Sequence, residues 1–212
     1  MSMSRGSPAL AEARKEEIIQ ACAKLYETMS FKEITIKEIG AATSFTRTSI
    51  YNYFETKEEI FLSLLQREYE KWAEAMNGIM EQKEAMPRDE LAQTLARTLT
   101  DRPRLLRLLS MNLYDSEANS RPERLAEFKV TFGASMETVG RMVKKYIPEM
   151  NDTELQRFLY AFFPFIYGIY PYTVVSEKQK LAMDQAGIPY VYLSAYDLTY
   201  ACLNKLLAVI ER

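Results

Sequence analysis

Apolar residues recur at helical spacing along almost the whole chain, and no stretch shows the strict alternation of a half-buried strand. The first helix is expected to start near Ser7-Pro8, because a capping residue there precedes a proline, which suits the first helical position. The apolar face of this helix consists of Ile18, Cys22, Leu25, Tyr26 and Met29. The pattern therefore predicts an all-α protein.

Short capped helices are predicted after this first helix. Thr35-x-x-Glu38 and Thr56-x-x-Glu59 are capping boxes, which place the starts of a second and a fourth helix. Thr46 lies between them and is expected to cap a third helix over residues 47–54. These short helices cannot bury their own apolar side chains, so the first and fourth helices must cover them. The result is a three-helix, helix-turn-helix domain, which we expect to span residues 1–56.

The rest of the chain, residues 57–212, is expected to form a larger helical bundle. Helical periodicity continues from Lys57 to about Glu84, which is longer than a small domain needs, and five later prolines mark helix boundaries. The segments 114–120 and 177–187 are expected to be loops. Further helices are predicted at residues 88–100, 102–113, 121–146, 152–176 and 190–211.

The amino-acid composition excludes several classes of catalytic and metal-binding site. Histidine is absent, which excludes Ser-His-Asp and Cys-His nucleophile systems and HExxH zinc sites. Cys22 and Cys202 fall on apolar helical faces, so we expect buried thiols in a reducing cytoplasm, with a disulfide or redox sensor as the alternative. No phosphate-binding glycine motif is present. We therefore expect no metal, no cofactor and no enzymatic activity, and chemistry by tyrosine, lysine or carboxylate groups stays as the alternative.

Net charge and targeting signals do little to identify the partner of the protein. Net charge is −2, and residues 1–58 hold eight basic residues and eight glutamates, so only local placement of charge can indicate a polyanionic partner. The N-terminal MSMSRGSPAL lacks the regions of a secretory signal, and no apolar run approaches the roughly 18 residues that span a bilayer. A cytoplasmic protein without a membrane partner is expected.

The predicted third helix carries a polar face suited to reading DNA. Helical spacing places Thr48 and Asn52 on one side of it, with Arg47 and Tyr51 beside them. Arginine and amide side chains pair with purine edges in the major groove, and the other two offer donors and contacts to the thymine methyl group. The first amides of the helix can hold a phosphate or a base-edge acceptor. A capping, surface or core role is the alternative for any one of these residues, but the whole set favours DNA.

Phosphate contacts are expected around this face. Tyr53 and Lys57 flank it, and the N-terminus of the second helix, near Thr35 and Lys37, offers a further site. The expected DNA-binding residues are Thr35, Lys37, Thr46, Arg47, Thr48, Ser49, Tyr51, Asn52, Tyr53 and Lys57.

The segment TIKEIGAATSFTRTSIYNYFETK resembles the DNA-binding motif of the TetR family of bacterial transcriptional regulators. Two positions depart from the family pattern: Gly40 replaces a common alanine, and Ser44 replaces the common turn glycine. A left-handed Ser44 would cost roughly 1–2 kcal/mol. The matching residues are Thr35, Ile36, Ile39, Phe45, Thr46, Thr48, Ser49, Ile50, Tyr51, Tyr53, Phe54, Lys57, Glu58 and Ile60.

The resemblance implies a homodimer that places one recognition helix per subunit in successive major grooves of a palindromic, double-stranded DNA operator. By similarity, phosphates would be contacted by Thr46, Tyr51, Tyr53 and Lys57, and bases would be read by Arg47, Thr48 and Asn52.

The resemblance also implies that the last two helices form the dimer and that the C-terminal bundle encloses an inducer pocket. Two apolar seams agree with an intermolecular four-helix interface, and an intramolecular core is the alternative. The first seam consists of Leu155, Phe158, Leu159, Phe162, Ile166, Ile169 and Tyr170. The second consists of Tyr192, Tyr196, Thr199, Leu203, Leu206 and Ile210.

The segment FFPFIYGIYPYTVV is interrupted by Pro164, Gly168 and Pro171. Pro164 is expected to kink its helix and leave a gap, although aromatic residues at helical spacing are more often plain core. With no histidine and little buried charge, a ligand of such a gap would be small and apolar, or aromatic and weakly polar. The expected ligand-binding residues are Met111, Phe128, Phe132, Met136, Phe162 and Tyr167.

Together these features predict a sequence-specific, DNA-binding transcriptional regulator, most simply a ligand-responsive repressor, with activation as the alternative. Ligand binding is expected to tilt the helix that begins at Lys57. A helical ligand-binding or scaffolding protein, whose helix pair contacts protein, is the competing class. The operator, the regulated genes and the effector are not encoded in readable form.

Overall fold

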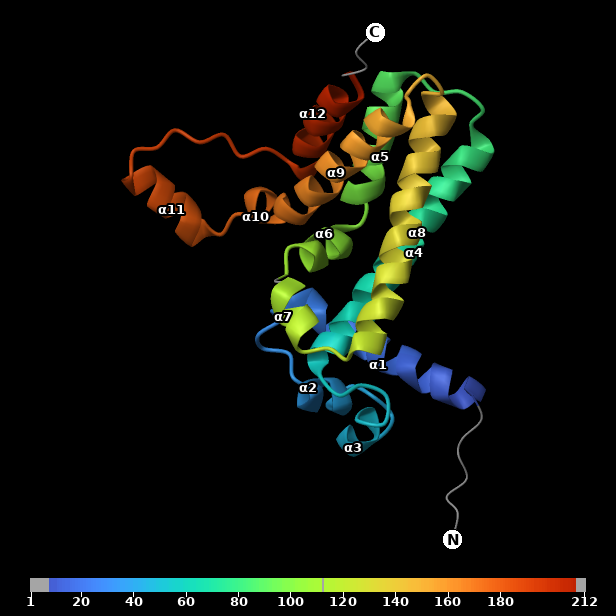
Figure 1. Ribbon diagram of the computed structural model, residues 1–212. Helices are drawn as coiled ribbons and strands as arrows, with labels where there is room; N and C mark the ends of the chain where they lie inside the picture. Colours follow the sequence, from blue (N-terminus) through green and yellow to red (C-terminus); the bar gives the residue numbers. More distant parts are fainter. Residues whose placement is uncertain (1–7, 112, 209–212) are drawn as a thin grey trace. The chain divides into compact units, whose positions relative to one another are not determined.

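The computed structural model describes residues 8–111 and 113–208, and these contain twelve α-helices and no strand, as expected for an all-α chain (Figure 1). The described residues divide into two compact units. The first takes in residues 8–67 and 113–130, and the second takes in residues 68–111 and 131–208. The division expected at residue 56 stays a prediction about function, because the compact units follow packing rather than the motif.

The first unit contains the N-terminal helices and the helix-turn-helix segment. Its core packs Phe61 against the rings of Tyr26 and Phe31, with ring centroids 5.1 and 4.8 Å away. Other buried members are Ile18, Ile34, Ile39, Ile50, Phe54 and Leu64. The helices are α1 (Pro8–Thr28), α2 (Ile36–Ala41), α3 (Arg47–Ile50), the first part of α4 (Lys57–Gln82), α7 (Leu113–Ala118) and the first part of α8 (Pro122–Tyr146).

The second unit is a bundle around an aromatic core. The indole of Trp72 donates to the Oγ1 of Thr98 at 2.9 Å, and α12 packs against α5 and α9. Tyr69 and Trp72 are fully buried. Besides the remaining parts of α4 and α8, the helices are α5 (Arg88–Thr100), α6 (Pro103–Leu109), α9 (Asp152–Gly168), α10 (Tyr170–Thr173), α11 (Glu177–Gln185) and α12 (Ala195–Ala208).

Capping signals place most helix starts correctly. The amide of Glu59 donates to the Oγ1 of Thr56 at 3.2 Å, which confirms that cap. Thr35 caps α2, but it accepts from the amide of Lys37 rather than that of Glu38. Thr46 precedes α3 as expected, although its side chain makes no capping bond.

Two predicted loops were wrong. Residues 114–120 contain part of α7, and residues 177–187 contain α11. For α11 the reason is a cap, because the Oγ of Ser176 accepts from the amide of Gln179 at 3.2 Å.

Several predicted helix ends were also wrong. The third helix ends at Ile50, because the next amides, those of Asn52 and Tyr53, bond only three residues back, to the carbonyls of Ser49 and Ile50 (3.3 and 2.8 Å). The helix expected at 102–113 ends at Leu109, and that expected at 152–176 ends at Gly168, followed by the short α10. The last helix begins at Ala195 because Ser194 and Asp197 cap each other, and its expected end at residue 211 lies outside the described residues.

Both cysteines are free thiols. Cys22 is buried as expected, and burial raises the pKa of its thiol to about 12. Cys202 is only half-buried, so the expectation of a buried thiol was wrong there, and partial burial still raises its pKa. None of the described helices is long and apolar enough to cross a membrane.

Candidate nucleic-acid interface

Helices α2 and α3 approach each other closely at Gly40. A Cβ atom built on this residue would lie 3.2 Å from both the Cα and the Cβ of Arg47, which is closer than most side chains pack. Glycine therefore lets α3 lie against α2 at this point. This contact gives a physical reason for the departure from the family's alanine at the same position.

The turn between the two helices is held by α1. The amide and the hydroxyl of Ser44 both donate to the carboxylate of Glu17, the hydroxyl at 3.1 Å. These bonds lower the pKa of Glu17, chiefly through the backbone amide. No described residue other than glycine has a positive φ, so Ser44 is not left-handed and the energetic cost expected for that conformation does not arise.

The polar face expected on the third helix is present at its start and in the turn that follows. Arg47, Thr48 and Asn52 are exposed, and the side chains of Thr48 and Asn52 have no hydrogen-bond partner among the described residues. Arg47 donates to the hydroxyl of Tyr51 at 3.2 Å, with its guanidinium 5.9 Å from the ring centroid. The face therefore presents a cation with a fixed orientation beside an open amide and an open hydroxyl.

The N-terminus of α3 keeps part of its hydrogen-bonding capacity. The hydroxyls of Thr46 and Ser49 bond each other at 3.1 Å, and the amide of Ser49 donates to the carbonyl of Thr46 at 2.8 Å. Since the side chain of Thr46 does not cap the helix, the amides of Arg47 and Thr48 have no acceptor within it.

The two lysines expected to hold phosphates differ in their surroundings. Lys37 is exposed at the start of α2, and its ammonium has no partner among the described residues. Lys57 instead donates to the carbonyls of Phe31 and Ile34, at 2.7 and 3.1 Å, with the ring centroid of Phe31 at 4.2 Å. The ammonium of Lys57 thus ties the chain between α1 and α2 to the start of α4.

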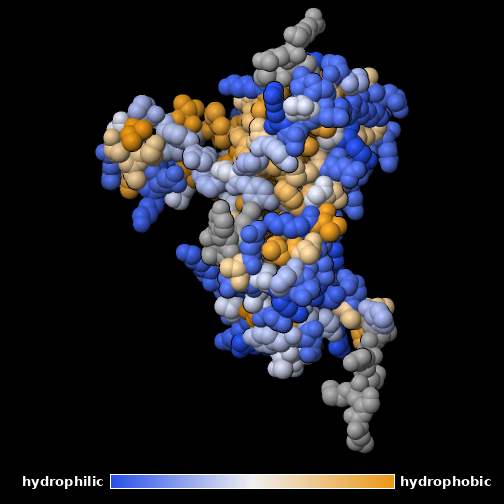
Figure 2. All heavy atoms as spheres, viewed as in Figure 1, coloured by the Kyte–Doolittle hydropathy of each residue, from blue (hydrophilic) through white to orange (hydrophobic). Residues whose placement is uncertain are grey.

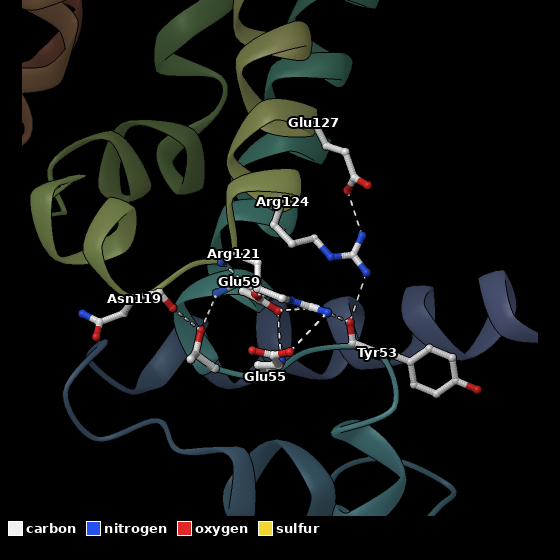
Figure 3. Close-up of polar contacts among 8 residues, drawn as sticks. Tyr53, Glu55, Glu59, Asn119, Arg121, Arg124 and Glu127 are labelled. Carbon is white, nitrogen blue, oxygen red and sulfur yellow. Dashed lines mark hydrogen bonds and ion pairs between the residues drawn. The ribbon is translucent and has the colours of Figure 1, made fainter.

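An ion pair between the buried carboxylate of Glu59 and the partly exposed Arg121 lies behind the interface (Figure 3). Glu59 has no exposed surface, and its carboxylate accepts the Nε, Nη2 and backbone N–H groups of Arg121 at 2.7, 2.8 and 3.0 Å. The amide of Glu55 donates to the same carboxylate at 2.9 Å. Burial by itself raises the pKa of Glu59, but these hydrogen bonds outweigh it and hold the pKa below its usual value.

The same network reaches the end of residues 47–53, which carry the predicted DNA-contacting side chains and are called the reading segment below. The backbone carbonyl of Tyr53 accepts from Arg121 at 3.2 Å and from Arg124 at 3.1 Å, whereas the Tyr53 ring points away from the network (Figure 3). Neither arginine was expected from the sequence, because more than 60 residues separate them from Glu59 and Tyr53. The only local signal was Glu59, whose capping-box position marked it as a hydrogen-bonding carboxylate.

The residues expected to bind a ligand are not gathered around one described cavity. Phe128 is buried in the first unit, and the other five lie in the second. There, Phe132 packs edge-on against Phe163, with centroids 5.4 Å apart, and the hydroxyl of Tyr167 bonds that of Tyr69 at 2.9 Å. Phe132 is thus partly buried in a contact between aromatic rings, and a ligand role for the six residues stays a prediction.

A different cavity lies at the interrupted helix. It measures about 330 Å³ and has an apolar lining. Pro164 and Gly168 contribute from α9, which runs through the proline, and both break the helical stripe in the sequence. The remaining lining residues are Phe165, Ile169, Tyr172, Tyr190 and Leu198.

The two apolar seams are partly used inside the second unit. Leu155 and Leu159 face Gly140, the nearest side-chain atoms lying 3.6 and 3.7 Å from a Cβ built there, and α12 packs on α9. Tyr192 is exposed, and Ile210 lies outside the described residues. The seam residues buried within the chain are Phe158, Phe162, Ile166, Ile169, Thr199 and Leu203.

Exposed apolar side chains gather around α11 and the segment after it, where Figure 2 shows a hydrophobic surface. The members of this surface are Tyr172, Val174, Leu181, Ile188, Tyr190, Val191, Tyr192 and Leu193. Within the described residues, no group of three or more Cys, Asp or Glu side chains could hold a metal ion.

Solved structures with the same fold are regulators. The FadR repressor of Thermus thermophilus, a TetR-family protein solved with lauroyl-CoA, is 20% identical, with a TM-score of 0.60 over 93% of this chain and 96% of that one. A TetR/AcrR-family regulator from Thermobifida fusca is 19% identical, with a TM-score of 0.61 over 94% and 100%. The fatty acid degradation regulator FadR from Bacillus halodurans is 15% identical, with a TM-score of 0.59 over 92% and 99%.

Family models cover nearly all of the described chain. No curated protein matches the sequence. Residues 18–64 match the family described as bacterial regulatory proteins, tetR family. Residues 66–208, well over half of the chain, match the tetracyclin repressor-like C-terminal domain. The chain therefore belongs to the TetR family of bacterial transcriptional regulators.

Proposed function

We propose that this protein is a homodimeric, sequence-specific DNA-binding repressor that an apolar effector releases from its operator. The observation that carries the proposal is the exposed face formed by Arg47, Thr48 and Asn52 on a helix-turn-helix of the TetR family. Such a face fits the major groove, where arginine pairs with guanine and asparagine with adenine.

Residue roles follow from the availability of donors. Arg47, Thr48 and Asn52 read base edges, and Tyr51 holds the guanidinium of Arg47 in place while contacting a phosphate. Phosphate contacts are also assigned to Lys37, Thr46 and the other polar residues around this face, Thr35, Ser49 and Tyr53.

Lys57 keeps a smaller part in DNA binding than its motif position implies. Two of its three N–H donors are used by the carbonyls of Phe31 and Ile34, so one remains for a phosphate. Its main role in the proposal is to fix the start of α4 against the chain that leads into α2.

The effector is assigned to the class of acyl compounds. The cavity at Pro164 and Gly168 is apolar, and its volume of about 330 Å³ lies at the lower end of the roughly 300–1,000 Å³ of small-molecule pockets. The structurally similar FadR of Thermus thermophilus holds lauroyl-CoA. An acyl chain in this cavity, with its polar end toward solvent, therefore suits the lining better than a charged metabolite would.

Release of DNA requires the effector to prefer one arrangement of the dimer. Moving a two-state equilibrium from 1:99 to 99:1 takes about a 10⁴-fold difference in affinity, or roughly 5.5 kcal/mol. In this proposal the effector tilts α4, which changes the separation of the two recognition helices.

DNA binding is tested by selecting duplexes from a random pool with the purified dimer and titrating the selected duplex against salt. We expect a palindromic motif and an affinity that falls steeply with salt, because several phosphates are neutralised. If the folded dimer prefers no duplex at modest ionic strength, the proposal is wrong and a helical scaffolding protein is favoured instead.

The switch is tested on the selected duplex with and without saturating lauroyl-CoA, and with coenzyme A alone as the matched control. Weaker operator binding with the acyl compound only is the expected result. Equal affinity under all three conditions would remove acyl compounds of this length as effectors and leave the DNA-binding proposal intact.

A further inference from the structure

The end of the reading segment is hydrogen-bonded to residues at the start of α8. The carbonyl of Tyr53 accepts from one guanidinium N–H of Arg121 and one of Arg124, at 3.2 and 3.1 Å (Figure 3). The guanidinium of Arg124 also lies 5.6 Å from the ring centroid of Phe54. Because the amides of Tyr53 and Phe54 bond back to Ile50, this carbonyl is rigidly connected to α3.

Both guanidinium groups are themselves held in place. Arg121 is fixed by the buried Glu59, and its Nη1 lies 3.5 Å from the carboxylate of Glu55. Arg124 pairs with Glu127 at 2.8 Å, and its side chain is only 18% exposed. The charge-assisted hydrogen bond from Arg124, which is largely shielded from water, is stronger and more directional than an exposed one.

A third hydrogen bond joins the same two parts of the chain, the start of α4 and the segment before α8. The hydroxyl of Thr56 donates to the carbonyl of Asn119 at 2.7 Å, which joins the cap of α4 to the chain just before α8. Residues 53–59 and 119–124 are therefore connected by several bonds that do not involve the DNA-reading side chains.

We propose that Arg121 and Arg124 are positioning residues for DNA recognition. They are assigned no contact with a base, but through the Tyr53 carbonyl they fix the orientation of the reading segment. The inference rests on the proposed DNA-binding function and adds the device that orients it. It also makes α8 a second element, beside α4, whose displacement moves the reading segment.

Arg124 is the residue to vary, because Arg121 also neutralises a buried carboxylate and its loss threatens folding. The test compares Arg124→Gln with Arg124→Lys, which retains a charged donor. Lys129→Gln is the matched control: it removes one positive charge from the same helix, and its ammonium pairs with Glu117 at 2.9 Å rather than with the reading segment.

Affinities are measured for the selected operator and for a scrambled duplex of equal length. We expect Arg124→Gln to weaken operator binding about tenfold more than Lys129→Gln, which is the effect of losing one charge-assisted hydrogen bond. Both variants should bind the scrambled duplex alike, and Arg124→Lys should recover part of the loss. Equal operator losses in Arg124→Gln and Lys129→Gln would overturn the proposal.

Amide hydrogen exchange of the DNA-free protein provides the readout that a purely structural role would not give. Faster exchange confined to residues 51–54 in Arg124→Gln, with an unchanged thermal midpoint, is the expected result. Unchanged exchange there, or faster exchange throughout α1 as well, would overturn the positioning role. If the unmodified protein selects no duplex, the proposed function fails. The hydrogen-exchange measurement still decides whether Arg124 holds residues 51–54 in place.

Discussion

Glu59 and Lys57 stand two residues apart at the start of α4, and each uses its charge inside the first unit. The carboxylate of Glu59 receives four hydrogen bonds, and the ammonium of Lys57 caps two carbonyls. Charged residues in this motif thus also hold the first unit together. At the scale of single residues, the interface depends on which charges are already satisfied and which, like that of Lys37, face solvent.

Acid should weaken the fold through Glu59. Since hydrogen bonds hold its pKa in the folded state below the ordinary 4.5, the unfolded chain takes up the proton first. The stabilisation is therefore complete above about pH 5 and is lost as the pH falls through the folded pKa. Urea unfolding of the unmodified protein should show similar stability at pH 7 and pH 5 and lower stability at pH 4.

The matched pair for this measurement is Glu59→Gln and Glu58→Gln. We expect Glu59→Gln to cost roughly 1–3 kcal/mol at pH 7, because Arg121 loses its buried charged partner, and to flatten the acid dependence. Only part of the dependence should disappear, since hydrogen bonds also lower the pKa of Glu17, Glu33, Glu149 and Asp152. The same acid dependence in both variants would contradict the assignment to Glu59.

Base reading should depend on Arg47 and Asn52. Each alanine substitution is expected to weaken binding to the selected operator by about 1–3 kcal/mol, which is the value of one good base contact, and to relax preference at one position. Competition binding against single-base operator variants measures both effects. Lys32→Ala, which removes an exposed charge from the same unit, is the control and should relax no base preference. Unaltered base specificity in both Arg47→Ala and Asn52→Ala would contradict the assignment of base reading to these residues.

At the scale of elements, caps explain where helices begin better than hydrophobic spacing does. Asn151 and Glu154 form a full capping box at α9, and Ser194 with Asp197 starts α12 five residues later than the apolar pattern suggests. The pattern was weakest for α11, which buries no residue at all. A nine-residue helix without a buried face leaves no hydrophobic signal to read.

Two caps of similar chemistry should therefore differ in their effect on stability. Thr56→Ala removes the bond to the amide of Glu59 and the bond to the Asn119 carbonyl, and should lower the free energy of unfolding by about 1–2 kcal/mol. Ser176→Ala should leave global stability unchanged, because α11 is not packed into a core. Chemical denaturation measures the first effect, and hydrogen exchange over residues 177–185 should detect local fraying in the second. Equal global losses would show that α11 contributes to the folded core.

At the scale of the whole molecule, binding of DNA and binding of effector are assigned to different compact units. The reading face belongs to the first unit, and the cavity at Gly168 belongs to the second, while α4 and α8 contribute residues to both. Coupling between the two functions requires that the effector bind one arrangement of the dimer more tightly than the other. A substitution can therefore remove the coupling without damaging the DNA-binding site.

Filling the cavity should uncouple the protein from its effector. Gly168 lines the cavity, and a Cβ atom built on it meets no atom within 4 Å, so Gly168→Leu adds bulk at the cavity without a clash of the backbone. We expect at least a tenfold loss of lauroyl-CoA affinity by calorimetry, the size of effect that one blocking side chain produces, with operator affinity unchanged. Gly133→Leu is the control, since its Cβ also meets open space and it does not line the cavity. Normal effector release in Gly168→Leu would place the ligand elsewhere, with the six residues expected from sequence as the next candidates.

Sequence alone determined the all-α class, the helix-turn-helix, the family and most helix starts. These properties depend on local signals, namely helical periodicity, caps within three residues, and a contiguous motif from Thr35 to Ile60. Where the apolar pattern was ambiguous, at the end of the third helix and at α7 and α11, local reasoning failed.

Only the tertiary structure decided which side chains are available and which are already paired. It turned the ammonium of Lys57 toward Phe31 and Ile34, joined Glu59 to Arg121, and packed Phe132 edge-on against Phe163. Each outcome depends on partners about 20 to 60 or more residues away, which compete for the same donor or the same apolar surface. No spacing rule within one helix contains that competition. For this reason the exposed polar face of Arg47, Thr48 and Asn52 could be predicted from the sequence, whereas the contacts of Arg121 and Arg124 with Tyr53 could not.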